Sequence, residues 1–208
     1  MIYKAAALAG LLMLSSAAGA TVTDSFAEGV SGFQSGDTHI SDFSDCTGLV
    51  LTGAGTGCYT GLHDGIAAPP AGDDTQYLAV LGGGTATFTF SGAHMISFDV
   101  GSVDAFNSVT VTLLGAGGPV TLTGSELTGN AATGDQHSDL TNGRLTIFGT
   151  NNEAFTGLVL SSSGNSFEID NLATSGAVPE TSSWALFLAG FGAIGAVARR
   201  RRPASAIA

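Results

Sequence analysis

Aspartate and histidine occur together at two similar places in this sequence. Residues 36–39 read Gly-Asp-Thr-His and residues 134–137 read Gly-Asp-Gln-His, and each tetrad is followed by a serine and an aspartate, which are Ser41 and Asp42 or Ser138 and Asp139. Such residues can ligate a metal ion or pair for acid–base chemistry. A Gly-Asp step is also a common way to open a turn in β proteins. The sequence favours turns with exposed histidines, and we predict neither catalytic residues nor metal ligands in these tetrads.

Two carboxylates far apart in the chain, Glu28 and Asp170, are candidates for a structural calcium site. Carboxylates from chain ends that meet across a β-sandwich would supply the hard oxygen ligands that calcium prefers. The chain has no self-sufficient calcium-loop motif. We therefore expect no cofactor, with structural calcium as the open alternative.

The sequence gives less support to sugar binding and to nucleophilic catalysis. Exposed aromatic rings with nearby Asn or Asp could bind a sugar, and the candidates are Tyr59, Tyr77, Asp104 and Asn107. For Tyr77, packing in the core is favoured over this role. For Asp104 and Asn107, turn formation is favoured. The sequence contains no Gly-x-Ser-x-Gly elbow, His-Glu-x-x-His motif, P-loop or nucleotide-binding glycine pattern. We predict a noncatalytic protein.

The chain has two cysteines, Cys46 and Cys58, in a glycine-rich stretch. In an oxidising compartment they should form a disulfide, which would contribute about 3 kcal/mol on the chain-entropy model. The alternatives are free buried thiols or a metal site, and a metal site would need more ligands than two cysteines.

Charge is distributed unevenly along the 208 residues. Arg144 is the only basic residue between the two terminal segments, and it stands among 16 carboxylates, which gives that stretch a formal charge of −15. Such a field repels nucleic acid and anionic lipid headgroups. The sequence therefore predicts no nucleic-acid partner.

Alternation of apolar and polar residues predicts β-strands through the middle of the chain. The predicted strands are residues 77–81, 85–90, 95–100, 109–113, 120–123, 144–148, 155–160 and 167–172, separated by Gly, Asn, Asp and Ser turn signals. No helix is expected here, and the region before residue 62 is less regular. Eight to ten strands without intervening helices predict an all-β fold, an antiparallel β-sandwich or jelly-roll-like domain.

The N-terminus has the features of a secretory signal peptide over residues 1–20. Lys4 supplies a positive charge, residues 5–14 form an apolar run, and Ala18 and Ala20 form a small-x-small cleavage site. A permanent membrane helix is disfavoured, because this run is too short for about 30 Å of hydrocarbon.

The C-terminus, residues 178–203, combines a short motif, an apolar helix and a basic cluster. Val178, Pro179 and Glu180 precede Trp184 and Ala185, and the apolar stretch that we predict as a transmembrane helix, 183–198, ends at Arg199, Arg200, Arg201 and Arg202. The arginines should hold their end of a marginally long span in the cytoplasm as a stop-transfer signal, which leaves the preceding chain outside.

This order of features resembles the PEP-CTERM sorting domain, in its PEPxxWA variant. The motif occupies residues 178–185, and Thr181 stands where the family usually has a second proline. The resemblance implies recognition by an exosortase, a membrane transpeptidase-like enzyme that cleaves near the motif and releases or transfers the preceding domain. An ordinary single-pass anchor is the alternative.

Segments 101–107 and 166–171 also resemble the ectodomains of other exosortase-dependent surface proteins, which implies a β-sandwich without a defined activity. Together these features predict one ectodomain, residues 21–177, held transiently at the inner membrane and sorted to the cell surface or an exopolysaccharide matrix, with glycan as a candidate partner. The alternative is an extracellular hydrolase with an unrecognised active site.

Overall fold

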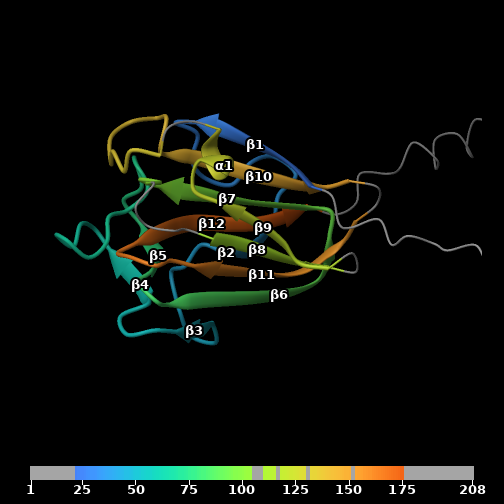
Figure 1. Cartoon of the computed structure of the whole chain (residues 1–208), viewed down its shortest axis with the longest axis horizontal. Helices are drawn as coiled ribbons and strands as arrows, with labels where there is room; N and C mark the ends of the chain where they lie inside the picture. Colours follow the sequence, from blue (N-terminus) through green and yellow to red (C-terminus); the bar gives the residue numbers. More distant parts are fainter. Residues whose placement is uncertain (1–21, 105–109, 116–117, 130–131, 151–152, 176–208) are drawn as a thin grey trace, which may run out of the picture.

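Antiparallel strands in two sheets account for most of the structure. The computed structural model describes residues 22–104, 110–115, 118–129, 132–150 and 153–175 (Figure 1). The larger sheet has the order β1 (Val22–Glu28), β10 (Gly143–Gly149), β7 (Met95–Gly101), β12 (Phe167–Ser175), β5 (Gln76–Val80) and β4 (Gly57–Thr60), with β2 (Thr38–Ser41) also paired to β12. The smaller sheet has the order β3 (Val50–Thr52), β6 (Thr85–Ala93), β11 (Phe155–Ser161), β8 (Thr110–Gly115) and β9 (Val120–Thr123).

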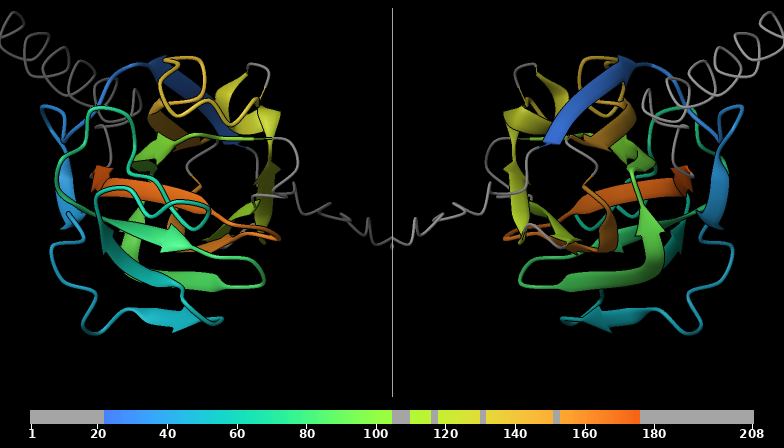
Figure 2. Two further views of the ribbon diagram at one scale, coloured as in Figure 1. Left: turned by 90° about the vertical axis from the view of Figure 1, so that its left-hand side faces the viewer. Right: turned by 90° about the vertical axis from the view of Figure 1, so that its right-hand side faces the viewer.

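The two sheets enclose one apolar core. The two views of Figure 2 show the arrangement of the strands after a quarter turn in either direction. Alternate residues of each strand point into the core, as the pleat of a β-strand requires. In β7 these are Ile96, Phe98 and Val100, and in β11 they include Leu158 and Leu160, all fully buried. The predicted antiparallel sandwich is thus confirmed as two packed sheets.

All eight predicted strands are present, and two expectations were wrong. Residues 22–60 contain four further strands, β1 to β4, which the irregular sequence did not reveal. A single helical turn, α1 (Ser125–Thr128), follows β9, where we expected no helix. The Thr123 amide and hydroxyl both donate to the Glu126 carboxylate at its start, the kind of local capping that stabilises a first turn.

The outer face of the larger sheet, turned away from the core, is also buried over part of its central strands, where Asp99, Arg144 and Glu168 are each 2% exposed. Connecting segments cover it, and Pro70 packs so tightly on β7 that a Cβ atom added at Gly101 would lie 3.0 Å from the Pro70 Cα. Tyr77, Ala79 and Leu81 form a second apolar cluster with Ala67 on this face. Segment 67–72 therefore packs on the outer face of this sheet.

A buried ion-pair network fixes part of this cover. Arg144 of β10 is 2% exposed; its Nη1 lies 2.8 Å from Asp99 Oδ1 on β7, and its Nη2 lies 2.7 Å from Asp37 Oδ2 on the covering segment. The guanidinium group also donates to the Ser97 hydroxyl and to the Asn171 carbonyl. One arginine therefore joins three strands and a loop.

The predicted disulfide between Cys46 and Cys58 is confirmed. Their Cα atoms lie 5.8 Å apart, and neither cysteine is free. This excludes the free-thiol and metal alternatives. The bridge links the segment before β3, an edge of the smaller sheet, to β4, an edge of the larger one.

The predicted signal peptide and sorting tail, including Ala18, Ala20, Pro179 and Glu180, lie outside the described residues. Within the part of the chain that the structure describes, we find no helix with the length and apolar character needed to cross a membrane.

We expect Arg144→Met to destabilise the domain strongly. Removing the cation leaves the buried Asp37 and Asp99 carboxylates uncompensated, which should lower the free energy of unfolding by about 3–5 kcal/mol in urea denaturation. A triple variant that adds Asp37→Asn and Asp99→Asn is the control and should recover most of this loss. A single-variant loss below about 1 kcal/mol, the value of an exposed pair, would contradict the prediction.

Candidate functional site

The pairing of the larger sheet brings several connecting segments together at one place. Gly101, the last residue of β7, pairs with Glu168 near the start of β12, and Val100 pairs with Gly143 at the start of β10. The segments that follow β7 and precede β10 and β12 therefore meet, and the 61–68 segment joins them. Polar side chains from these turns can converge although they are far apart in sequence.

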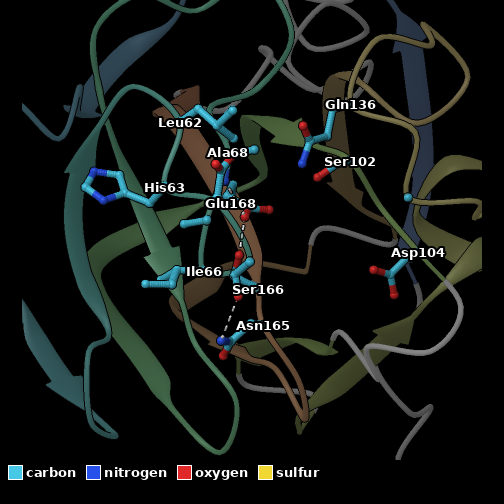
Figure 3. Close-up of a pocket in the computed structure, with 14 residues that line it drawn as sticks. Leu62, His63, Ile66, Ala68, Ser102, Asp104, Gln136, Asn165, Ser166 and Glu168 are labelled. Carbon is cyan, nitrogen blue, oxygen red and sulfur yellow. Dashed lines mark hydrogen bonds between the residues drawn. The ribbon is translucent and has the colours of Figure 1, made fainter.

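A pocket of about 260 Å³ lies among these segments (Figure 3). Glu168 lies near its centre, with Ala68 and Ser166 beside it, and His63 lies on the opposite side from Asp104 and Gln136. The lining is mainly polar, with two exposed apolar side chains, and consists of Leu62, His63, Asp64, Gly65, Ile66, Ala67, Ala68, Ser102, Asp104, Gly134, Gln136, Asn165, Ser166 and Glu168.

Glu168 is the most perturbed group in this pocket. Its side chain is 2% exposed, and its Oε1 accepts hydrogen bonds from the Ala68 amide at 3.1 Å and from the Ser166 hydroxyl. Its Oε2 is buried and has no partner among the described residues. Burial raises the pKa of Glu168 to about 7, although the Ser166 hydrogen bond opposes the shift. This carboxyl group therefore keeps its proton to a higher pH than an ordinary glutamate.

A second pair of carboxyl groups lies farther along β12. Asp170 is 1% exposed, and its Oδ2 lies 3.0 Å from the Thr75 hydroxyl, which lies 2.6 Å from Asp73 Oδ1. Burial, and next the neighbouring Asp73 carboxyl group, raise the pKa of Asp170 to about 8. This group is distinct from the pocket, because neither aspartate lines it.

The two Gly-Asp tetrads are not equivalent in the structure. In the first, Asp37 is buried against Arg144, while His39 is exposed and stacks on Phe33 with ring centroids 3.6 Å apart. In the second, Asp135 is exposed and its Oδ1 accepts the amide of the exposed His137. The expectation of turns with exposed histidines is confirmed, but it did not foresee the ion pair of Asp37.

The two calcium candidates from the sequence do not lie together. Glu28 pairs with Gly143 of β10, and two strands, β10 and β7, separate its strand from β12, which carries Asp170. At about 4.8 Å between strands, this separation is too large for one ion to join both carboxylates. Pairing Glu28 with Asp170 was therefore wrong.

The sugar-binding candidates are divided. Tyr77 is fully buried and donates its hydroxyl to the Gly61 carbonyl at 2.8 Å, so the core interpretation is confirmed for it. Tyr59 is half-buried and packs its ring edge-on against His63 of the pocket. Asp104 is buried and lines the pocket, whereas Asn107 lies outside the described residues.

Sequence reasoning missed Glu168 and Asp73. The sequence assigned no role to Glu168, which lies in the predicted strand 167–172, where an outward polar residue is normally solvated. No local pattern marks it as buried, because its cover comes from residue Ala68, 100 positions away. The described ranges contain no group of three or more His, Cys, Asp or Glu side chains arranged to hold a metal ion.

Comparison with known proteins gives only remote similarity. No family model and no curated protein matches the chain. An exo-β-1,3-galactanase from Phanerochaete chrysosporium, solved with β-1,3-galactotriose, is 16% identical with a TM-score of 0.38, over 67% of this chain and 29% of that chain. A family 11 carbohydrate-binding module of a cellulosomal cellulase of Clostridium thermocellum is 16% identical with a TM-score of 0.27, over 68% of this chain and 95% of the module. At these scores neither similarity bears on function.

We expect Glu168→Gln to remove one pH-dependent part of the stability. The wild-type carboxyl group keeps its proton up to a pKa of about 7 when folded but loses it near 4.5 when unfolded, so its contribution is complete below pH 4.5 and lost as the pH rises to 7. Across this range, the unfolding free energy of the wild type should fall relative to the variant by about 2–3 kcal/mol. Urea denaturation at several pH values, with chelator present throughout, measures this difference. Parallel stability curves would contradict it.

Proposed function

We propose that this chain is an exported cell-surface or exopolysaccharide-matrix protein, sorted through its C-terminal PEP-CTERM-type signal by an exosortase. We propose further that its β-sandwich is noncatalytic and binds glycan in the pocket around Glu168. The Cys46–Cys58 disulfide supports an oxidising destination, because such bridges rarely persist in a reducing cytosol.

The observation that carries the binding proposal is the composition of the pocket. Ser102, Asp104 and Gln136 offer hydrogen-bonding groups, while Leu62 and Ile66 are 59% and 42% exposed among the lining residues. A sugar presents hydroxyl groups and apolar C–H faces together, so a surface with both characters suits it. Ordinary ligand pockets of this kind combine apolar walls with a few placed polar groups.

The size and charge of the site narrow the glycan class. A pocket of about 260 Å³ is below the range of about 300–1,000 Å³ for drug-sized ligands, which favours one sugar unit or the end of a chain. The surrounding domain carries a large negative charge. Like charges repel at this range, so a neutral glycan is favoured over an anionic one.

One observation favours the second candidate, an extracellular hydrolase. The pKa of Glu168 near 7 gives a carboxyl group that can donate a proton at neutral pH, which is the property of a general acid. Against this role, Glu168 is only 2% exposed, so a substrate atom has little access to its carboxyl group. We therefore place binding first and turnover second.

We expect the exported protein to bind a neutral glycan on an array and to release no sugar from it. Leu62→Ala and Gln136→Ala should each weaken calorimetric affinity about fivefold, the effect of one lost contact worth about 1 kcal/mol. Leu140→Ala is the matched control, since Leu140 is 49% exposed but does not line the pocket. Equal losses in Leu62→Ala and Leu140→Ala would argue against the pocket. Turnover that Glu168→Gln abolishes would favour the hydrolase.

We expect the sorting step to depend on the Pro-Glu dipeptide. In an exosortase-containing host, the wild type should leave the membrane fraction with its C-terminal segment removed, while Pro179→Ala/Glu180→Ala should stay full length in the membrane. Fractionation with intact-mass measurement reads this out, and Ser182→Ala/Ser183→Ala, at the two variable positions of the motif, is the control. The sorting proposal fails if the wild type and the Pro-Glu variant are equally full length in the membrane.

A further inference from the structure

The side chains of Asp73, Thr75 and Asp170 bring together more hydrogen-bond acceptor oxygens than the one hydroxyl hydrogen between them can satisfy. The Thr75 hydroxyl lies 2.6 Å from Asp73 Oδ1 and 3.0 Å from Asp170 Oδ2. A threonine hydroxyl has one hydrogen and can donate to only one of these oxygens at a time. The second close contact then joins two oxygens without a hydrogen between them, which is favourable only if a proton or a cation lies nearby.

Two carboxylate oxygens at this place are also buried without partners. Asp170, itself 1% exposed, has no hydrogen-bond partner for Oδ1 among the described residues, and the same holds for Oδ2 of Asp73. Unpartnered buried carboxylate oxygens are costly and call for an explanation. Each aspartate therefore has a desolvated oxygen that no ordinary donor satisfies. The two carboxyl groups are also in hydrogen-bonding contact with each other, so a shared proton can hold them together, and a cation could take the place of that proton.

The backbone of β12 is irregular where it presents Asp170. Its pairing with β7 shifts register between Asp170 and Ala173, and the intervening Asn171 has a positive φ of 52°. Such bulges re-aim side chains and are common beside functional sites. The irregularity directs Asp170 toward the 73–75 turn, where Asp73 accepts the Thr75 amide.

The one buried cation in the described part of the chain does not neutralise this pair. Both guanidinium ion pairs of Arg144 go to Asp37 and Asp99. The Asn171 amide donates to both Asp99 and Asp170, but an amide carries no charge. Two adjacent carboxyl groups therefore share a buried environment without a positive side chain.

We propose that Asp73, Asp170 and Thr75 form a binding site for a calcium ion. Carboxylate and hydroxyl oxygens are hard ligands, which favour calcium or magnesium over zinc or copper. Two aspartates cannot complete either coordination shell, so backbone oxygens and water must supply the rest. Calcium accepts such mixed, irregular shells of six to eight oxygens, whereas magnesium demands a near-ideal octahedron.

This proposal is independent of glycan binding. The cation site lies outside the pocket, and its occupancy would fasten the 73–75 turn onto β12. A failure of the calcium proposal would leave the pocket untouched, and a failure of glycan binding would leave the cation site untouched.

Calcium binding to the exported protein, stripped with chelator, tests the proposal. Calorimetry should find one site per chain, and calcium at about 100 times its Kd should raise the Tm by about 5–10 °C. Asp170→Asn should abolish both effects and, without calcium, should unfold no lower than the wild type, because it removes one of the two facing carboxyl groups. If Asp170→Asn does not fold, Asp73→Asn in the turn provides the same test.

The matched control is Asp74→Asn, which removes an equal charge from the exposed neighbouring residue and should keep the full calcium response. Magnesium at the same concentration should give a smaller shift in Tm. Absence of calcium binding by the stripped wild type would overturn the proposal. An equal rise in Tm with calcium in the wild type and in Asp170→Asn would also overturn it. So would an equal rise with calcium and with magnesium in both proteins, because this is the behaviour of general charge screening.

Discussion

The structure depends on how one arginine is buried among carboxylates on the outer face of the larger sheet. Arg144, Asp99 and Asp170 stand side by side on three neighbouring strands, because the register pairs Arg144 with Asp99 and Asp99 with Asp170. Directly opposed like charges destabilise a sheet, and burial makes the repulsion worse. The arginine and the Asn171 amide offset this for Asp99, so the covering segments can close over a polar row.

That closure also creates the candidate sites. Glu168 and Asp170 are buried on the same sheet as Asp99, and this desolvation raises the pKa values of Glu168 and Asp170. The Ala68 amide and the Ser166 hydroxyl stabilise one oxygen of Glu168, but its second oxygen remains unpartnered. The same burial therefore disfavours the charged forms of these carboxyl groups and shifts their pKa values, as is common at binding sites.

The sequence predicted the strands that alternate and missed those that do not. β5 to β12 were predictable, because one face of each strand fills the core with apolar side chains at a spacing of two. The same alternation does not show that Glu168 and Asp170 are buried, since outward polar residues normally meet water. Only tertiary structure shows the cover supplied by Ala68 and by the 73–75 turn. No local pattern could pair Asp37 with Arg144, 107 residues away.

The N-terminal third of the domain is held to the sandwich mainly by a disulfide, an ion pair and side-chain hydrogen bonds. β1 to β4 are short or largely exposed, and Phe43, Ala67 and Ala68 are among the few buried apolar residues before β5. Because this segment buries little apolar surface, the hydrophobic free energy gained on folding offsets only part of the conformational entropy lost when the segment is ordered. Cys46–Cys58, Asp37–Arg144 and Thr75–Asp170 each fasten a different piece of it to the sandwich. The disulfide is a tie that an oxidising compartment supplies, and the calcium ion proposed at Asp73 and Asp170 would be another, so both agree with the proposed destination of the protein.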